Sequence, residues 1–201
     1  MSTRPLLALI ALVVGVASGS SSCARPNRDS NAALAQLRLV STPIRIAFVS
    51  SDRQATGVSG EIRFGGPLGR SALYLKFSND WRTHGVPRQA FLTLSAREGS
   101  ASSDSPVIVE AWRISADWQP PTLRSWSDKP NLAPPYARAR VTASPPRELR
   151  LDVSELVRFA AENPERDFGM AVIASGSDGP GATFSTGLAE GQAPRLELYL
   201  R

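Results

Sequence analysis

Few side chains in this chain of 201 residues are suited to acid–base or nucleophilic chemistry. His84 is the only histidine, and it lies in a polar stretch, residues 81–87, that predicts a loop. A nucleophilic triad needs a base beside its nucleophile, and the chain has no Gly-x-Ser-x-Gly elbow. A lyase would combine histidine with tyrosine and arginine, but the spacing links no tyrosine to His84. The sequence therefore favours a protein that is not an enzyme, with a polysaccharide-degrading enzyme as an alternative.

Residues that bind metal ions are also sparse. A zinc site needs three or four histidine, cysteine or acidic ligands, and one histidine together with a single cysteine, Cys23, excludes the usual combinations. Residues 102–105 and 177–179 offer oxygen ligands of the kind that calcium prefers, although no EF-hand pattern is present. We expect no cofactor, with a structural calcium ion as an alternative.

An aromatic side chain in polar surroundings points to the binding of sugars. Sugar-binding proteins stack aromatic rings on the apolar faces of pyranoses while polar groups bond to the hydroxyls. Trp81 is flanked by polar residues, among them Asn79 and Asp80, on a predicted turn. We predict that Trp81 is the most exposed tryptophan and that it contacts a ligand together with Arg82 and His84. In the alternative, its ring closes one end of the fold.

The net charge is positive by five, and nearly all of the cations are arginine, with only Lys76 and Lys129 as lysines. A nucleic-acid-binding protein tends to gather its positive charge on one face. Here the arginines are spread along the chain, so we expect no nucleic-acid partner. Two interpretations remain open: a solvated arginine-rich surface, or attraction of an anionic polysaccharide whose carboxylates pair with guanidinium groups.

Alternating apolar and polar residues predict short β-strands throughout the chain. Leu73, Leu75 and Phe77 fall on one side of a strand, and Tyr74 and Lys76 fall on the other. Similar segments occur at residues 44–49, 61–64, 90–94, 107–113, 138–142, 149–153, 168–174 and 196–200, separated by Gly, Pro, Ser and Asp. This spacing predicts an all-β protein, a jelly-roll-like antiparallel β-sandwich.

One segment predicts a helix. Ser154 is placed to cap a helix that starts at Glu155, whose charge suits the positive end of the helix dipole. Leu156 and Phe159 would share one face, and the Asn-Pro pair at residues 163–164 would end the helix. We therefore expect one short helix in the sandwich.

The N-terminal region differs from the rest of the chain. Residues 6–17 form an apolar run too short to cross a bilayer but typical of a secretory signal peptide. Cys23 follows small residues, as in a bacterial lipoprotein, where the cysteine is acylated and becomes the mature N-terminus. The sequence predicts a signal peptide over residues 1–22, a flexible tether over 23–37 and a single domain over 38–201. In the alternative, the leader is cleaved elsewhere, for example after Ser18.

The run of residues 112–130 contains Trp118 and Trp126 and resembles the tryptophan-rich signature of DNRLRE-type domains, which are grouped with carbohydrate-binding module family 96. Segments similar to that family also occur in the family's order at residues 69–77, 151–157, 181–185 and 194–199. Two departures are the stretch 79–84 and Gln119. The resemblance implies a β-sandwich with one short helix and a polysaccharide ligand such as alginate. The resemblance and the apolar neighbours of both tryptophans favour burial, in the core or as a wedge that holds a loop against it; in the alternative, Trp118 and Trp126 stack on sugar rings.

Together these features predict an exported, membrane-anchored lipoprotein of the bacterial cell envelope, in the outer membrane or on the cell surface. Its single domain would bind a polysaccharide, such as one that contains uronic acids, without catalysis and as a monomer. A structural or adhesive surface protein that binds no sugar is the first alternative.

Overall fold

The computed structural model describes residues 37–51, 60–64, 70–96, 107–141, 148–175, 182–187 and 192–200. All of these belong to one compact unit, residues 34–201. The predicted signal peptide, the predicted acylation site Cys23 and the two predicted calcium loops lie outside the described residues. Among the described residues, no helix is long and apolar enough to cross a membrane.

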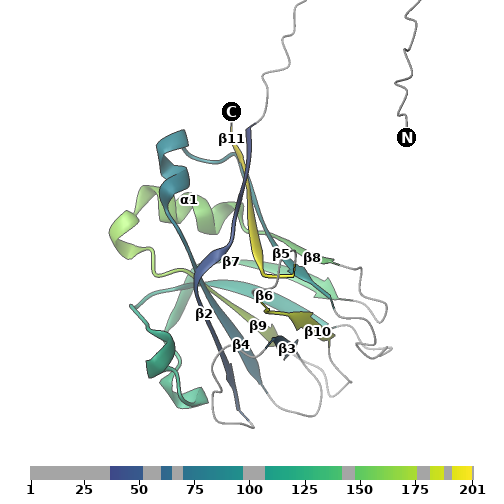
Figure 1. Cartoon of the computed structure of the whole chain (residues 1–201). Coiled ribbons are helices and arrows are strands. Elements are labelled where there is room, and N and C mark those ends of the chain that lie inside the picture. The colour runs from purple at the N-terminus through teal and green to yellow at the C-terminus, as the bar shows by residue number, and fades with distance from the viewer. Residues whose placement is uncertain are drawn as a thin grey trace, which may run out of the picture. The chain divides into compact units, whose positions relative to one another are not determined.

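Antiparallel sheets packed against one another form the fold (Figure 1). One sheet has four strands in the order β1-β11-β5-β8, and another has five in the order β2-β4-β9-β6-β7. A small sheet pairs β10 with β3. The strands are β1 Leu37–Ser41, β2 Pro43–Ser50, β3 Glu61–Phe64, β4 Ser71–Phe77, β5 Gln89–Ser95, β6 Val107–Ile114, β7 Leu132–Val141, β8 Glu148–Asp152, β9 Met170–Ser175, β10 Ala182–Ser185 and β11 Arg195–Leu200. Single helical turns occur at η1 Asp80–His84, η2 Pro120–Thr122, η3 Trp126–Asp128 and η4 Pro164–Arg166.

The path of the chain confirms the predicted fold class. Strands β1 and β2 follow each other but lie in different sheets, and β4, β5 and β6 alternate between the two layers. The chain crosses again from β7 to β8 and from β8 to β9. This repeated crossing gives a jelly-roll-like sandwich in which each sheet contains strands distant in sequence.

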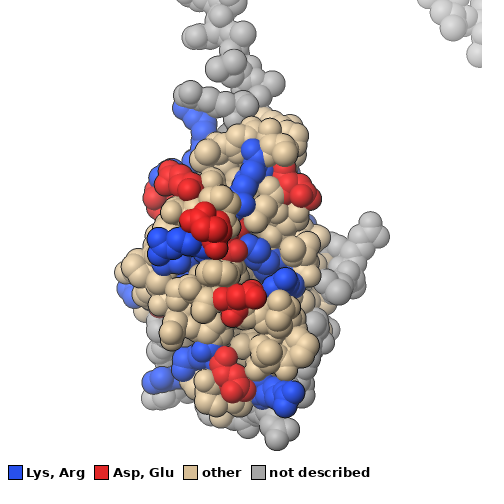
Figure 2. Space-filling view, turned by 90° about the vertical axis from the view of Figure 1, so that its left-hand side faces the viewer, with Lys and Arg blue, Asp and Glu red and all other residues tan. Residues whose placement is uncertain are grey.

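Charged side chains are mixed across the face that lies on the left-hand side of Figure 1. Figure 2 shows acidic and basic side chains interspersed on this face. Among the described residues, arginines form ion pairs such as Arg158 with Glu155 and Arg45 with Asp117. The face in Figure 2 does not gather charge of one sign.

The only helix among the described residues, α1 (Ser154–Glu162), lies close to its predicted position, but its cap differs. The helix begins at Ser154, so Val153 occupies the N-cap position and no side chain caps it. The Ser154 hydroxyl instead accepts a hydrogen bond from the Ala90 N–H and donates one to Asp152. The predicted capping by Ser154 is wrong, because a bond to β5 engages that hydroxyl.

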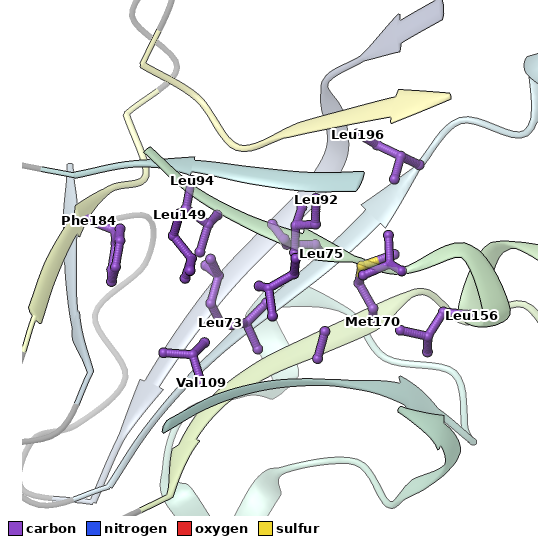
Figure 3. Close-up of a cluster of buried hydrophobic side chains, with 14 of the residues drawn as sticks. Leu73, Leu75, Leu92, Leu94, Val109, Leu149, Leu156, Met170, Phe184 and Leu196 are labelled. Atoms are coloured by element: carbon purple, nitrogen blue, oxygen red, sulfur yellow. The ribbon is translucent and has the colours of Figure 1, made fainter. Parts of the chain in front are cut away.

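The core lies between the two large sheets. Figure 3 shows Leu73 and Leu75 of β4 together with Leu92 and Leu94 of β5 in one cluster of buried side chains. Leu196 belongs to the same cluster. These residues are the apolar members of the alternating patterns, so burial of one side of each strand holds the layers together.

A glycine fixes the entry to β9. Gly169 has a φ of 95°, and a Cβ there would lie 2.2 Å from the Leu75 carbonyl oxygen. Only glycine fits such a conformation and such a close approach. Strand β9 consequently begins at Met170, two residues after its predicted start at Phe168.

Candidate functional site

Trp81 lies in η1 but does not face solvent. Its side chain is 6% exposed and belongs to the core between the sheets, whereas Trp112 and Trp126 are half buried. The prediction that Trp81 is the most exposed tryptophan is wrong, because the turn directs the ring inward while Asp80 faces outward. The position matches the alternative, a ring that closes one end of the sandwich.

Arg82 is held by an ion pair. A guanidinium nitrogen of Arg82 lies 3.1 Å from Oδ2 of Asp167, and Nζ of Lys76 lies 2.8 Å from the same oxygen. The same nitrogen of Arg82 donates to the Ala160 carbonyl oxygen. These contacts connect η1 to the end of α1, so they give Arg82 a structural role.

His84 is exposed at the end of η1. The nearby cavity that Trp81 lines has a volume of about 30 Å³, and neither Arg82 nor His84 lines it. Such a volume holds a water molecule but not a sugar ring. Trp81, Arg82 and His84 are therefore neighbours in the sequence, but the three side chains do not line a common pocket.

A larger site lies on the opposite side of the five-stranded sheet from the core. Residues 115–131, which connect β6 to β7, contribute to a second apolar cluster with the outward-facing side chains of β2, β4 and β9. The buried members of this cluster are Ala47, Val49, Ala72, Tyr74, Ile114, Trp118, Leu123 and Ala171. The connection thus forms a layer over part of this sheet face.

Trp118 anchors that connection. Its side chain is 4% exposed, its ring centroid lies 5.9 Å from that of Tyr74, and its indole N–H donates to the Phe168 carbonyl oxygen at 2.8 Å. Arg45 of β2 donates to the Trp118 carbonyl oxygen at 3.2 Å. The predicted burial of Trp118 is confirmed, and its role is that of a wedge that holds the connection on the sheet.

Hydrogen bonds also fix the turn that carries Trp126. Oδ2 of Asp128 accepts from the backbone N–H of Ser125 at 2.8 Å and from the Ser125 hydroxyl at 2.9 Å. The side-chain hydrogen bond from Ser125 is the main cause that lowers the pKa of Asp128, with the backbone bonds and Arg124 adding to it. Because this carboxylate orders η3, the position of the Trp126 backbone is fixed.

A pocket of about 390 Å³ lies between this turn and the sheet. Its lining combines the turn, the start of β7 and outward-facing parts of β4 and β9, and comprises Arg70, Tyr74, Trp126, Lys129, Leu132, Ile173 and Ala174. A volume of this size falls in the range of small-molecule sites. The pocket therefore has room for a sugar ring.

The pocket lining is cationic. Arg70 and Lys129 are both exposed, and no acidic residue is among the described residues that line the pocket. Neither cation forms an ion pair with any residue that the structure describes. Nζ of Lys129 lies 4.8 Å from the centre of the Trp126 ring, which favours a cation there without neutralising its charge. The site therefore presents two positive charges beside an aromatic ring.

Tyr74 is a buried member of the pocket lining. Burial raises the pKa of Tyr74 well above its usual range. The hydroxyl therefore stays protonated at neutral pH, where it can donate a hydrogen bond but cannot act as a base.

Sequence reasoning found only part of this pocket. The prediction that Trp126 is buried is partly wrong, because the ring is half buried and packs on the second apolar cluster from its edge. Arg70 and Lys129 were not singled out, because they lie far apart in the chain and only the fold brings them together. One signal was present, since Lys129 is one of two lysines and lies close to Trp126.

Comparison with known proteins identifies no relative. No family model matches the chain, and no curated protein shows significant similarity to it. Among the described residues, no group of three or more His, Cys, Asp or Glu side chains could hold a metal ion.

Proposed function

We propose that this protein binds an anionic saccharide, such as part of a uronic-acid polymer, in the pocket beside Trp126 and does not modify it. The observation that carries the proposal is the pocket itself, which contains two cations without acidic partners and an aromatic ring. Trp126 would stack on a pyranose, while Arg70 and Lys129 would pair with carboxylates. The resemblance to carbohydrate-binding module family 96 agrees with this ligand class.

The composition of the pocket argues against catalysis. Glycosidases use two carboxyl groups across the scissile bond, and none of the described residues that line this pocket carries a carboxylate. A lyase that used histidine would need His84, which also lies outside it. Binding without reaction is therefore the function that these side chains support best.

Titration calorimetry with oligouronates tests the proposal directly. We expect the domain of residues 38–201 to bind, and Arg70→Gln and Lys129→Gln each to weaken binding by about fivefold, since an exposed charge pair contributes about 1 kcal/mol. Arg88→Gln is the matched control. Arg88 is exposed just before β5 and does not line the pocket, so this substitution removes one positive charge elsewhere on the surface. An equal loss in the control, or no binding by the unmodified domain, would reject the proposal.

The alternatives have distinct outcomes in the same experiment. A structural or adhesive surface protein would bind none of the sugars, and a polysaccharide-degrading enzyme would release shorter products from them. Product analysis by chromatography after prolonged incubation separates binding from degradation.

Export and anchoring form a separate part of the proposal. We expect Cys23 to be acylated, with the residues between it and β1, which begins at Leu37, as the tether that links the domain to the membrane. Several acyl chains would anchor the protein stably. In a detergent-partition assay, the full chain should enter the detergent phase and Cys23→Ser should stay in the aqueous phase. Persistence of the variant in the detergent phase would contradict acylation at this cysteine.

A further inference from the structure

The same face of the five-stranded sheet continues beyond the pocket onto β6 and β7. Trp112 pairs with Tyr136, and Glu110 pairs with Arg138, in the antiparallel register of these two strands. Because side chains alternate along a strand, all four lie on the face opposite the core, where Tyr136 is 47% exposed. This part of the face bears an aromatic side chain accessible to solvent.

The aromatic pair is held rigidly. The rings of Trp112 and Tyr136 stack with centroids 4.3 Å apart and an interplanar angle of 14°. The Trp112 indole N–H donates to Oε2 of Glu110 at 3.0 Å, and Nε of Arg138 donates to Oε1 of the same carboxylate at 2.7 Å. The Tyr136 side chain would therefore lose little conformational entropy when a ligand binds to it.

The register places this pair next to the pocket. Ile173, which lines the pocket, pairs with Glu110 of β6, and Glu110 pairs in turn with Arg138 of β7. Two strand spacings, roughly 10 Å, therefore separate the pocket wall on β9 from the strand that carries Tyr136. A linear polymer that leaves the pocket across β9 would reach the aromatic pair.

The second area contains charges of both signs, because Asp152 and Glu155 lie with Tyr136 and Arg138 around a pocket of about 250 Å³. Arg138 is neutralised by Glu110, but Arg140, two residues further along β7, is exposed and forms no ion pair with any described residue. The alternation of β7 places Arg140 on the same side as Tyr136 and Arg138. Arg140 lies roughly 13 Å from Tyr136 along the strand, so its cation and the ring would contact different sugar residues of one polymer.

We infer that the ligand is an extended anionic polysaccharide that fills the pocket and continues over β9 and β6 to β7. Tyr136 provides a second stacking surface there, and Arg140 a second contact for a carboxylate. The inference rests on the proposed function and adds that several sugar residues are recognised at once, so that affinity rises with chain length.

A length series of oligouronates, from disaccharide to hexasaccharide, tests the inference by titration calorimetry. For the hexasaccharide, we expect Tyr136→Ala to weaken binding by about tenfold and Arg140→Gln by about fivefold. Disaccharide binding should not change in either variant. Tyr136→Phe keeps the ring and should keep most of the affinity, and Arg88→Gln should change neither ligand's affinity.

Each outcome has a distinct meaning. If the domain binds disaccharide and hexasaccharide equally well, or if Tyr136→Ala leaves hexasaccharide binding unchanged, the extended site is rejected while the pocket stands. If the unmodified domain binds neither oligomer, the proposed function fails together with the inference. Thermal unfolding of every variant, compared with the unmodified domain, separates a lost contact from a lost fold.

Discussion

The outer faces of the two large sheets contain the same kinds of side chain but use them differently. On the four-stranded sheet, Arg38 and Arg150 lie 3.0 and 3.3 Å from the carboxylate of Glu197, which is only 6% exposed. On the five-stranded sheet, Arg138 is paired with Glu110, but Arg70 and Lys129 line a pocket in which none of the described residues is acidic. The first face pairs Arg38 and Arg150 with a carboxylate, whereas the pocket on the second face holds two cations without an ion pair to any described residue.

The aromatic residues follow the same division. Arg150 lies 3.6 Å from the centre of the Phe91 ring and donates to the Tyr199 hydroxyl, which itself donates to Glu197. The rings and the cations of this face therefore satisfy one another. On the other face, the Trp126 ring contacts only the cation of Lys129 among the described ring contacts and borders an open pocket. Whether a ligand can contact an arginine or an aromatic ring therefore depends on whether that side chain already interacts with another side chain of the protein.

The largest expected effect is on the layer that builds the pocket. Trp118→Ala should lower the free energy of unfolding by about 3–5 kcal/mol, because it removes a buried ring from the cluster on the sheet and leaves a cavity. Denaturant titration measures the change. Trp126→Ala is the matched comparison, and we expect a loss of about 1 kcal/mol because its ring is half buried. Equal losses would show that the two rings do not differ in role.

Charge reversal in the pocket should act on binding and leave stability unchanged. Lys129→Glu places an acid next to the ligand's carboxylate, so we expect oligouronate binding to fall by about 30-fold or more, equivalent to about 2 kcal/mol. Because Lys129 is exposed and lacks an acidic partner among the described residues, the unfolding midpoint should stay the same. Binding that persists after the reversal would place the ligand elsewhere.

The outer face of the four-stranded sheet, where Arg38 and Arg150 pair with Glu197, is called the paired face, and substitutions there should act on stability and leave binding unchanged. Glu197→Gln removes the negative charge that Arg38, Arg150 and Tyr199 share and replaces one acceptor oxygen with a donor, so we expect a loss of stability of about 1–2 kcal/mol without loss of binding. Denaturant titration and calorimetry measure the two quantities. A variant that keeps full stability but loses ligand would reverse the roles of the two faces.

The pH dependence of stability should report the same carboxylate. Burial alone would raise the pKa of Glu197, but the hydrogen bond and charge of Arg38, with Tyr199 and Arg150, hold it below its usual value of 4.5. A depressed pKa stabilises the fold above the unfolded-state value, and this stability is lost as the pH falls from about 4.5 through the folded-state value. Glu197→Gln should therefore show a shallower loss of stability in this acidic range than the unmodified domain.

The smallest expected effect concerns Thr93 of β5, which lies on the paired face. Its hydroxyl oxygen is buried without a hydrogen-bond partner. Thr93→Val removes this polar atom at nearly constant volume, so the unfolding free energy should stay level or rise by up to about 1 kcal/mol. A clear destabilisation would reveal a buried water molecule that bonds to the hydroxyl.

Alternation of apolar and polar residues predicted most of the sandwich, but the strand ends depended on tertiary pairing. The strand predicted at residues 138–142 is β7, which begins six residues earlier at Leu132. Pro134 and Pro135 argue against a strand when only the sequence is considered. They are tolerated because β7 is an edge strand, where a missing N–H need not break a ladder bond.

The candidate site was harder to predict than the fold, because exposure depends on packing between distant segments. The polar neighbours of Trp81 suggested an exposed ring, but η1 turns that ring into the core while its neighbours face solvent. The predicted contacts Arg82 and His84 lie beside it without forming a pocket. Trp118 and Trp126 have similar local sequences, and only their places on the second apolar cluster distinguish a buried wedge from a pocket wall.

The sequence by itself determined the class of fold and the position of the helix α1. It also determined which face of each strand is buried, since apolar and polar residues alternate along the strands. It also determined that acid–base residues are scarce and that arginine is the main cation. Tertiary structure alone decided which arginines find carboxylates and which aromatic rings stay accessible. Ion pairs and ring contacts join residues from different strands, so no local pattern in the chain records them.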